Sequence, residues 1–266
     1  MFDSHIHMMK EGNKEDFYHS VHEAGITGGI VLSLPPGTFD NNTYSISQRL
    51  EKVLALTENK ENFFPFYFID PLEKDARSQV DAAVSLGIAG FKIMCIDDYP
   101  DNKTAMRVYE RIAYYDKPVL FHSGILWNSK NSSNFNRPAN FECLINVPGL
   151  RFALAHVGWP WYDECLAVFG KYIHSNLCGN NNTMFIDVTP GTPEIYRKEV
   201  LEKLFRIGYD VEDFVIWGTD NSCENYNVEW TRNWARIDGD IFRGLELAGE
   251  QVGKIFENNM LKFIRG

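Results

Sequence analysis

The chain has 266 residues, enough for one large domain or two small ones, and its 44% apolar and 14% aromatic content excludes intrinsic disorder as the main state. A formal net charge of −10 disfavours nucleic acid as a partner. No apolar run reaches the ~20 residues of a membrane span, and the first residues lack the features of a signal peptide, so we expect a cytoplasmic protein. The five cysteines form no C-x-x-C pair, and we expect no disulfide framework.

Short apolar runs, most of them rich in β-branched or aromatic residues, occur eight times along the chain and predict eight strands. In chain order they are FDSHIHM near residue 2, GGIVLSL near 28, FFPFYFID near 63, IAGFKIM near 88, PVLFHSG near 118, RFALAHVG near 151, TMFIDVT near 183 and FVIWGTD near 214.

Segments with a 3.6-residue apolar period lie between these runs and predict helices. They are DFYHSVHEAG, SQRLEKVLALTENK, RSQVDAAVSLG, MRVYERIAYYD, YDECLAVFGKYI and EIYRKEVLEKLFRIG. A last helix is predicted from about Leu245 to Ile264, after the eighth strand.

This alternation of strands and helices indicates the fold. Continuous apolar strands joined by helices indicate a parallel sheet that is covered on its outside, and eight such units favour a closed barrel. No linker, charge block or internal repeat divides the chain. Residues 1–266 are therefore predicted to form a single α/β domain, a (β/α)8 TIM barrel with a C-terminal helix.

Histidines and one aspartate fall at the carboxyl ends of four predicted strands, where the active sites of such barrels lie. His5 and His7 end the first strand, His122 the fifth, His156 the sixth and Asp220 the eighth. Alternate residues of a strand share a face, so His5 and His7 are expected to point the same way. One such histidine alone is more often structural, but four that converge on one mouth predict a metal centre.

The segments MFDSHIHM, VLFHSG, PGLRFALAHVGWP and VIWGTDNS resemble signature segments of the amidohydrolase superfamily, in particular its amidohydrolase-2 branch. The similarity extends over nearly the whole chain, including the terminal KIFENNMLKFIRG. It implies a metal-dependent TIM-barrel enzyme whose divalent ion, usually zinc, is held by His5, His7, His122 and Asp220. His156 is then a catalytic or substrate-orienting group, or an additional ligand.

The chemistry of these side chains agrees with that implication. Three neutral imidazoles and a carboxylate suit Zn²⁺ with water in an open position, and Mn²⁺ is the alternative. Such an ion lowers the pKa of its water to about 7, so no side-chain nucleophile is needed. Asp220 can orient or deprotonate that water, and His156 can stabilise an oxyanion or move a proton. One ion per chain is expected.

Four further residues are candidate substrate contacts. Lys92 on the fourth strand is predicted to face the mouth, where three interpretations stay open: it is solvated or paired with an acid, it contacts a substrate anion, or it is carboxylated and bridges two ions, as in two-metal members of the superfamily. Trp127 and Arg137 follow the fifth strand, and Trp159 follows the sixth. Aromatic walls and a guanidinium suit an organic acid, whereas rim packing is the alternative for the tryptophans.

Together these residues predict a metal-dependent hydrolase that acts on a C–O or C–N bond of a small, carboxylated molecule. A non-oxidative decarboxylase of an aromatic or unsaturated acid is the first alternative, because the resembled branch contains both chemistries. A TatD-type deoxyribonuclease is disfavoured by Lys92, by G-T-D instead of E-T-D, and by the acidic charge. A non-catalytic metal-binding barrel is disfavoured because Asp220 is retained beside all four histidines. The expected partner is a small-molecule substrate, not nucleic acid or a membrane, and a homodimer is left open.

Overall fold

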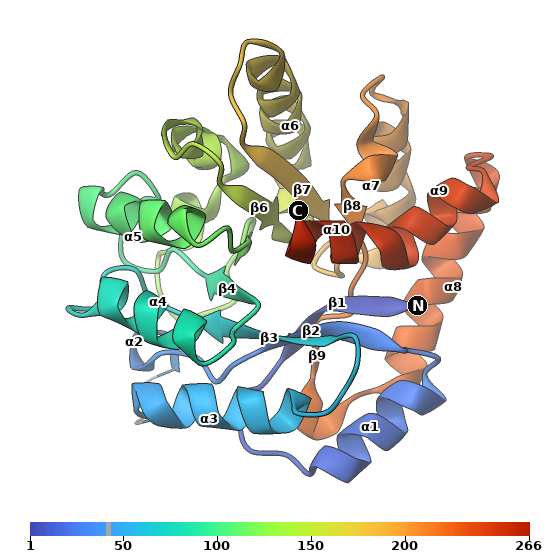
Figure 1. Ribbon diagram of the computed structural model, residues 1–266. Coiled ribbons are helices and arrows are strands. Elements are labelled where there is room, and N and C mark those ends of the chain that lie inside the picture. The colour runs from blue at the N-terminus through green and yellow to red at the C-terminus, as the bar shows by residue number, and fades with distance from the viewer. Residues whose placement is uncertain (41–43) are drawn as a thin grey trace.

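The computed structural model describes residues 1–40 and 44–266 of the chain. Its strands are all parallel to their neighbours and follow one another around a single curved sheet, with helices on the outside (Figure 1). The strands are β1 (Phe2–His7), β2 (Gly28–Leu32), β3 (Phe63–Phe68), β4 (Gly90–Ile93), β5 (Val119–Phe121), β6 (Arg151–Leu154), β7 (Thr183–Asp187), β8 (Val215–Ile216) and β9 (Asn221–Ser222). The predicted α/β TIM-barrel class is confirmed.

The helices connect the strands and pack against their outer face. They are α1 (Lys14–Glu23), α2 (Gly37–Asp40), α3 (Ile46–Thr57), α4 (Ala76–Ser85), α5 (Lys103–Tyr114), α6 (Tyr162–Leu177), α7 (Glu194–Arg206), α8 (Val228–Gly244), α9 (Gly249–Gly253) and α10 (Asn259–Arg265). A π-helical turn over Lys254–Asn258 joins α9 to α10. None of the helices in these described ranges has the length and apolarity needed to cross a membrane.

Capping side chains determine where several helices begin. Asn13, Asn102 and Asn227 accept hydrogen bonds from backbone N–H groups in the first turns of α1, α5 and α8. Ser45 and Gln48 form a reciprocal capping box at the start of α3. These side chains satisfy N–H groups that have no partner within the helix, which explains why these helices begin where they do.

The barrel closes through an eighth strand that is split in two. β8 pairs with β7, and β9 pairs with β1. Between them, the Ser4 N–H donates to the Trp217 carbonyl at 2.9 Å and the Asp220 N–H donates to the His5 carbonyl at 3.1 Å. The fully buried Asp3 accepts from the Thr219 N–H at 2.9 Å and from its hydroxyl at 2.6 Å. These bonds join the first strand to the last and complete the barrel.

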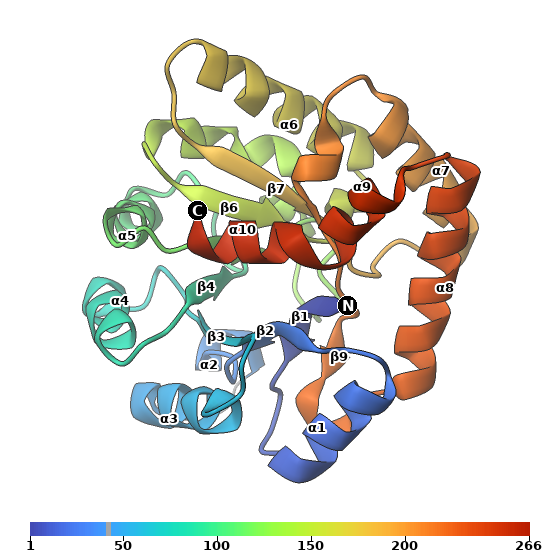
Figure 2. The ribbon, with the colours of Figure 1, turned by 45° about the vertical axis from the view of Figure 1, so that its right-hand side comes forward.

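The interior of the barrel is filled with apolar side chains at its amino-terminal end. Phe66, Leu120 and Phe185 from the strands pack with Met260 and Phe263 of α10. That helix crosses this end of the barrel (Figure 2). The side chain of Arg151, at the start of β6, donates to the Phe263 carbonyl at 2.6 Å. The amino-terminal end is therefore covered by α10.

The C-terminal region differs from the prediction. The expected helix over Leu245–Ile264 is present from Gly249 to Arg265, as α9, the π-helical turn and α10 without a break. The 17-residue α8 before it was not predicted. α8 buries Trp234, Asp238 and Phe242 at a spacing of four residues. In the sequence, Asp238 interrupts the apolar stripe of this helix and hides its amphipathic pattern. In the folded chain its charge is neutralised by the Arg197 guanidinium at 2.7 Å, so the residue can be buried.

Candidate active site and metal centre

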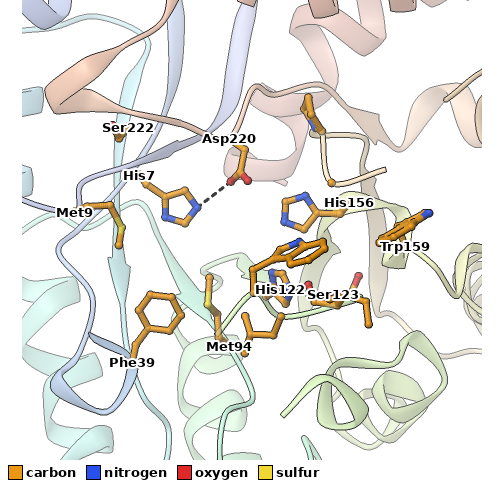
Figure 3. Close-up of a pocket in the computed structure, with 15 residues that line it drawn as sticks. His7, Met9, Phe39, Met94, His122, Ser123, His156, Trp159, Asp220 and Ser222 are labelled. Carbon is orange, nitrogen blue, oxygen red and sulfur yellow. Dashed lines mark hydrogen bonds and ion pairs between the residues drawn. The ribbon is translucent and has the colours of Figure 1, made fainter. Parts of the chain in front are cut away.

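A pocket of about 300 Å³ opens at the carboxyl end of the strands (Figure 3). Four of the five residues predicted as metal ligands or catalytic groups line it: His7, His122, His156 and Asp220. The fifth, His5, is fully buried beside them. The structure therefore brings together, around one mouth, side chains from the ends of β1, β5, β6 and the eighth strand, as the spacing of the strands predicts.

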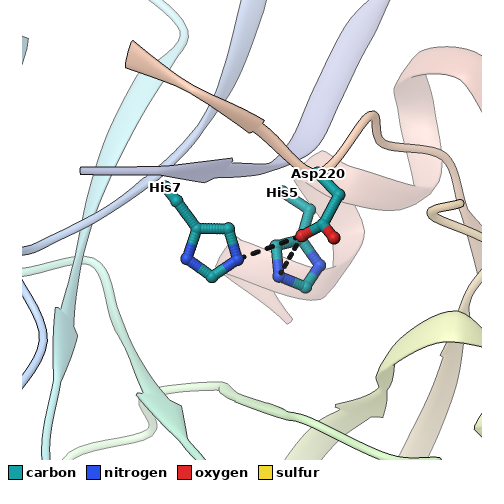
Figure 4. Close-up of side chains that lie close together, drawn as sticks. All are labelled: His5, His7 and Asp220. Carbon is teal, nitrogen blue, oxygen red and sulfur yellow. Dashed lines mark hydrogen bonds and ion pairs between the residues drawn. The ribbon is translucent and has the colours of Figure 1, made fainter. Parts of the chain in front are cut away.

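His5, His7 and Asp220 form the tightest group (Figure 4). One potential ligand atom of each lies within 4.8 Å of the others. The His7 Nε2 is 3.0 Å from Asp220 Oδ1, and the His5 Nε2 is 3.6 Å from the same oxygen. Two imidazoles and one carboxylate that point at a common space are a donor set that Zn²⁺ or Mn²⁺ accepts.

Asp187, at the end of β7, holds the His5 ring in place. Its Oδ2 is 2.7 Å from His5 Nδ1, and both side chains are fully buried. Its other oxygen accepts the Thr189 N–H at 2.7 Å and also the Thr189 hydroxyl. A proton on Nδ1 leaves the His5 Nε2 lone pair toward Asp220, which is the arrangement that metal-binding histidines require. Burial raises the pKa of Asp187 to about 7.

In His122 and His156, a hydrogen bond to a backbone carbonyl determines which ring nitrogen carries the proton. The His122 Nε2 is 3.1 Å from the Ile125 carbonyl, and the His156 Nδ1 is 3.3 Å from the Thr189 carbonyl. A carbonyl can only accept, so each of these nitrogens carries the proton and the opposite nitrogen is free. Burial lowers the pKa of His156 to about 4 and the pKa of His122 well below its usual range.

The backbone is strained at two site residues, His156 and Asp220, and at Val157, which follows His156. His156 (φ 60°), Val157 (φ 50°) and Asp220 (φ 60°) all adopt the left-handed conformation. This conformation is uncommon for residues other than glycine and is an outlier for a β-branched residue. At Asp220 it interrupts the extended strand between β8 and β9 and leaves the carboxylate 37% exposed in the pocket. Strain of this kind persists where the surrounding structure enforces it, as at active sites.

The carboxyl group of Asp220 is held in its ionised form. Burial alone raises its pKa, but the hydrogen bond from His7 and the positive charges of nearby groups, including Lys92, outweigh that effect and lower the pKa below its usual value. A carboxylate that stays ionised can ligate a cation and can accept a proton.

Lys92 does not reach solvent. Its side chain is fully buried beneath the pocket, and its Nζ is 3.2 Å from His5 Nε2. Burial lowers the pKa of Lys92 to about 8, against the opposing attraction of Asp220 and Asp187. The solvated form considered for this lysine is therefore excluded, and the residue is not among the side chains that line the pocket.

The three other candidate contacts separate into two kinds. Trp127 and Trp159 line the pocket, as expected of a binding wall. Arg137 does not: its guanidinium forms a short ion pair with Glu164 and lies over the Trp161 ring at 5.1 Å. Arg137, paired with Glu164, therefore contributes to the packing of the rim and is not among the residues that line the pocket.

The donor set fits a divalent cation. His5 has its ring oriented by a buried carboxylate, and its Nε2 lies 3.6 Å from the Asp220 carboxylate that also contacts His7. A bound ion would replace the hydrogen bond that Lys92 now makes to this nitrogen. His122, which was predicted as a fourth ligand, is outside this three-residue group; its ring centroid is 5.1 Å from that of His156.

The sequence interpretation missed Asp187 and three apolar residues of the pocket wall, Met9, Phe39 and Met94. Asp187 had a signal, because an acidic residue at the end of an apolar strand lies at the active end of such a barrel. The wall residues had none, since Met and Phe occur throughout the core.

The fold and this cluster together define the class: a (β/α)8 barrel with a candidate metal centre at the carboxyl end of its strands. Among solved structures, the chain is similar to an uncharacterised TIM-barrel protein from Bordetella bronchiseptica, at 16% identity and a TM-score of 0.74, covering 99% of this chain and 97% of that one. It is similar to 2,6-dihydroxybenzoate decarboxylase from Rhizobium, at 13% identity and a TM-score of 0.62, with the same coverage.

A third similar structure is amidohydrolase 2 from Bifidobacterium longum subsp. infantis, at 13% identity and a TM-score of 0.60, covering 99% of this chain and 97% of that one. No protein-family model matches the sequence, and no curated protein matches it. At these identities the likeness establishes the fold. The resemblance to amidohydrolases is thus confirmed at the level of the barrel over nearly the whole chain.

Proposed function

We propose that this chain is an enzyme of the amidohydrolase type, a metal-dependent hydrolase that acts on a C–O or C–N bond of a small organic molecule. The observation that carries the proposal is the His5–His7–Asp220 group at the bottom of a pocket, with the His5 ring oriented by Asp187. We further propose one divalent ion per chain, zinc or manganese, because this single group is the only one of its kind along the described ranges 1–40 and 44–266.

Each side chain has a role that follows from its position. A divalent ion, when bound, supplies Lewis acidity and a water of lowered pKa. His5 and His7 would hold it, together with one oxygen of Asp220. The exposed carboxylate of Asp220 would accept a proton during the reaction, a function that typically contributes 10²–10⁴-fold. His156, with its Nδ1 fixed on Thr189, presents the other nitrogen to orient the substrate or relay a proton.

A non-oxidative decarboxylase is the second candidate. It is favoured by the similarity in fold to a dihydroxybenzoate decarboxylase over almost the entire chain. The sequence predicts a carboxylated substrate, but neither Lys92 nor Arg137 is among the side chains that line the pocket. A substrate carboxylate would therefore have to lie at the histidine end, where a decarboxylase would need it. A cytoplasmic, small-molecule enzyme stays a prediction, as does any homodimer.

Metal analysis of the purified protein, followed by turnover assays, tests the proposal. About one Zn²⁺ or Mn²⁺ per chain is expected, and a chelator should abolish turnover of at least one substrate in a panel of lactones, amides and aromatic acids. Release of carbon dioxide from an acid would identify the decarboxylase. Two tightly bound ions would contradict the mononuclear centre, and no metal together with no activation by added Zn²⁺ or Mn²⁺ would refute the proposal.

A further inference from the structure

The pocket has a polar end and a largely apolar wall, and its lining residues in the described part of the chain include no lysine or arginine. His7, His156 and Asp220 are grouped at one end, while Phe39 and Met94 are on the opposite side (Figure 3). The wall comprises Met9, Phe39, Met94, Leu126, Trp127, Trp159 and Pro190. Its side chains offer the surface of a site for an apolar group rather than for a charged one.

Three cations of the surrounding loops and strands are already engaged. The Lys92 amine is buried against His5, and the Arg137 guanidinium pairs with Glu164. The Lys130 amine donates to the Thr38 carbonyl at 3.2 Å and lies 3.5 Å from Asp97. None of the three is among the lining side chains that the structure describes. An anionic group of the substrate at the apolar wall would lose its water without gaining a partner, which is costly.

The size of the pocket limits the apolar group. A cavity of about 150 Å³ lined by apolar side chains can hold benzene. The present pocket, at about 300 Å³, leaves room for a substituted single ring or a small bicyclic molecule. It is near the lower end of the range for pockets that bind small molecules.

Trp127 supplies the surface that would cover such a ring. Its side chain is 80% exposed although it lines the pocket. A large indole surface exposed at a binding mouth gains burial when a flat apolar group lies against it. It follows the fifth strand, on the loop that begins at His122, and thus lies at the same end of the barrel as the histidines.

From these features we infer that the substrate is a ring-sized apolar molecule with its polar, reacting group at one end and no charge at the other, and that Trp127 determines this specificity. The inference rests on the proposed function in one respect, which is that the histidine end is taken as the reacting end. It replaces the cation-anchored organic acid that the sequence suggests.

Three para-substituted benzamides test this inference, because they keep one polar end and differ only at the distal position. Binding of 4-methylbenzamide, 4-carboxybenzamide and 4-aminomethylbenzamide to the metal-loaded protein would be measured by calorimetry or ligand-observed NMR. The methyl compound should bind at least about tenfold more tightly than either charged one, a difference of ~1.4 kcal/mol. Trp127→Ala should weaken its binding about tenfold and leave the two charged compounds almost unchanged.

Tyr114→Ala is the matched control, since this aromatic side chain is 74% exposed at the end of α5 and does not line the pocket. It should bind all three compounds as the parent protein does. Equal or tighter binding of a charged compound, no effect of Trp127→Ala, or no binding of any of the three would overturn the inference. The proposed function fails by different readouts, because it would be refuted by the absence of metal even if the preference for the methyl compound held.

Discussion

At the scale of single residues, the candidate site depends on bonds that set which nitrogen of each histidine is free. Asp187 does this for His5, and the Thr189 carbonyl does it for His156. Both acceptors lie within three residues of each other at the end of β7. One short turn therefore orients two imidazoles that come from different strands.

Replacing Asp187 by Asn should weaken metal binding. The amide keeps the size of the carboxylate but loses the charge that holds the Nδ1 proton of His5, and such supporting carboxylates typically contribute 10–100-fold to metal affinity. The dissociation constant for Zn²⁺, measured by competition with a chromophoric chelator, should rise by about this factor. Asp16→Asn on the exposed face of α1 is the control. An unchanged affinity in Asp187→Asn would remove the orienting role.

Replacing Asp220 by Asn should nearly abolish turnover without unfolding the chain. Asparagine retains the size and one oxygen but cannot accept a proton, so a loss of 10²–10⁴-fold is expected with excess metal present. His19→Gln, on the exposed face of α1, should retain full activity. If metal-loaded Asp220→Asn keeps more than about a tenth of the activity, then Asp220 is not the proton acceptor.

At the scale of elements, the turn between β7 and α7 packs directly on a site histidine. A Cβ added at Gly191 would lie 2.8 Å from both Cβ and Cγ of His156. The close approach involves a side chain that lines the pocket, which is why this position requires glycine. α8, in contrast, contains a glycine with no such requirement, since a Cβ at Gly239 meets nothing within 4 Å.

The two glycines should respond to alanine in opposite ways. Gly191→Ala should lower the free energy of unfolding by about 1–3 kcal/mol, because the neighbours must shift to accept the methyl group. Gly239→Ala should raise it by roughly 0.5–1 kcal/mol, because alanine loses less backbone entropy in a helix. Urea denaturation of both variants measures these changes. Destabilisation by Gly239→Ala equal to that by Gly191→Ala would show that the close contact is not the cause.

At the scale of the whole molecule, stability and chemistry are at opposite ends of the barrel. The amino-terminal end is filled with aromatic side chains and covered by α10, whereas the carboxyl end contains the histidines and the open pocket. Residues at the first end can therefore be changed with little effect on the geometry of the second, provided that the barrel stays folded.

Phe263→Ala tests this separation. Phe263 is fully buried and contacts the rings of Phe66 and Phe185 at centroid distances of 6.1 and 5.2 Å. Truncation should cost about 3–5 kcal/mol of unfolding free energy through lost burial and the cavity left behind. Below the unfolding transition, the affinity for Zn²⁺ should equal that of the parent protein. A large loss of metal affinity in the folded variant would show that the two ends are coupled.

The order of strands and helices and the positions of the histidines could be predicted from the sequence, because apolar periodicity is a local property and parallel strands bring their carboxyl ends to one edge. The predicted C-terminal helix is present over Gly249–Arg265 with a π-helical turn inside it. The preceding α8 was missed, since the buried Asp238 disguises its inner face until Arg197 pairs with it. The contact between Asp187 and His5, 182 positions apart, depends on the closure of the barrel.

The surroundings of Lys92 and Arg137 also depend on the folded structure. The sequence by itself determined a barrel with histidines at its mouth, since that requires only the type and order of residues. The tertiary structure alone decided that Lys92 is buried below the pocket, that Arg137 pairs with Glu164, and that apolar side chains form the wall. The physical reason is that the charge available to a ligand depends on which partners a side chain meets in space, and local sequence does not contain those partners.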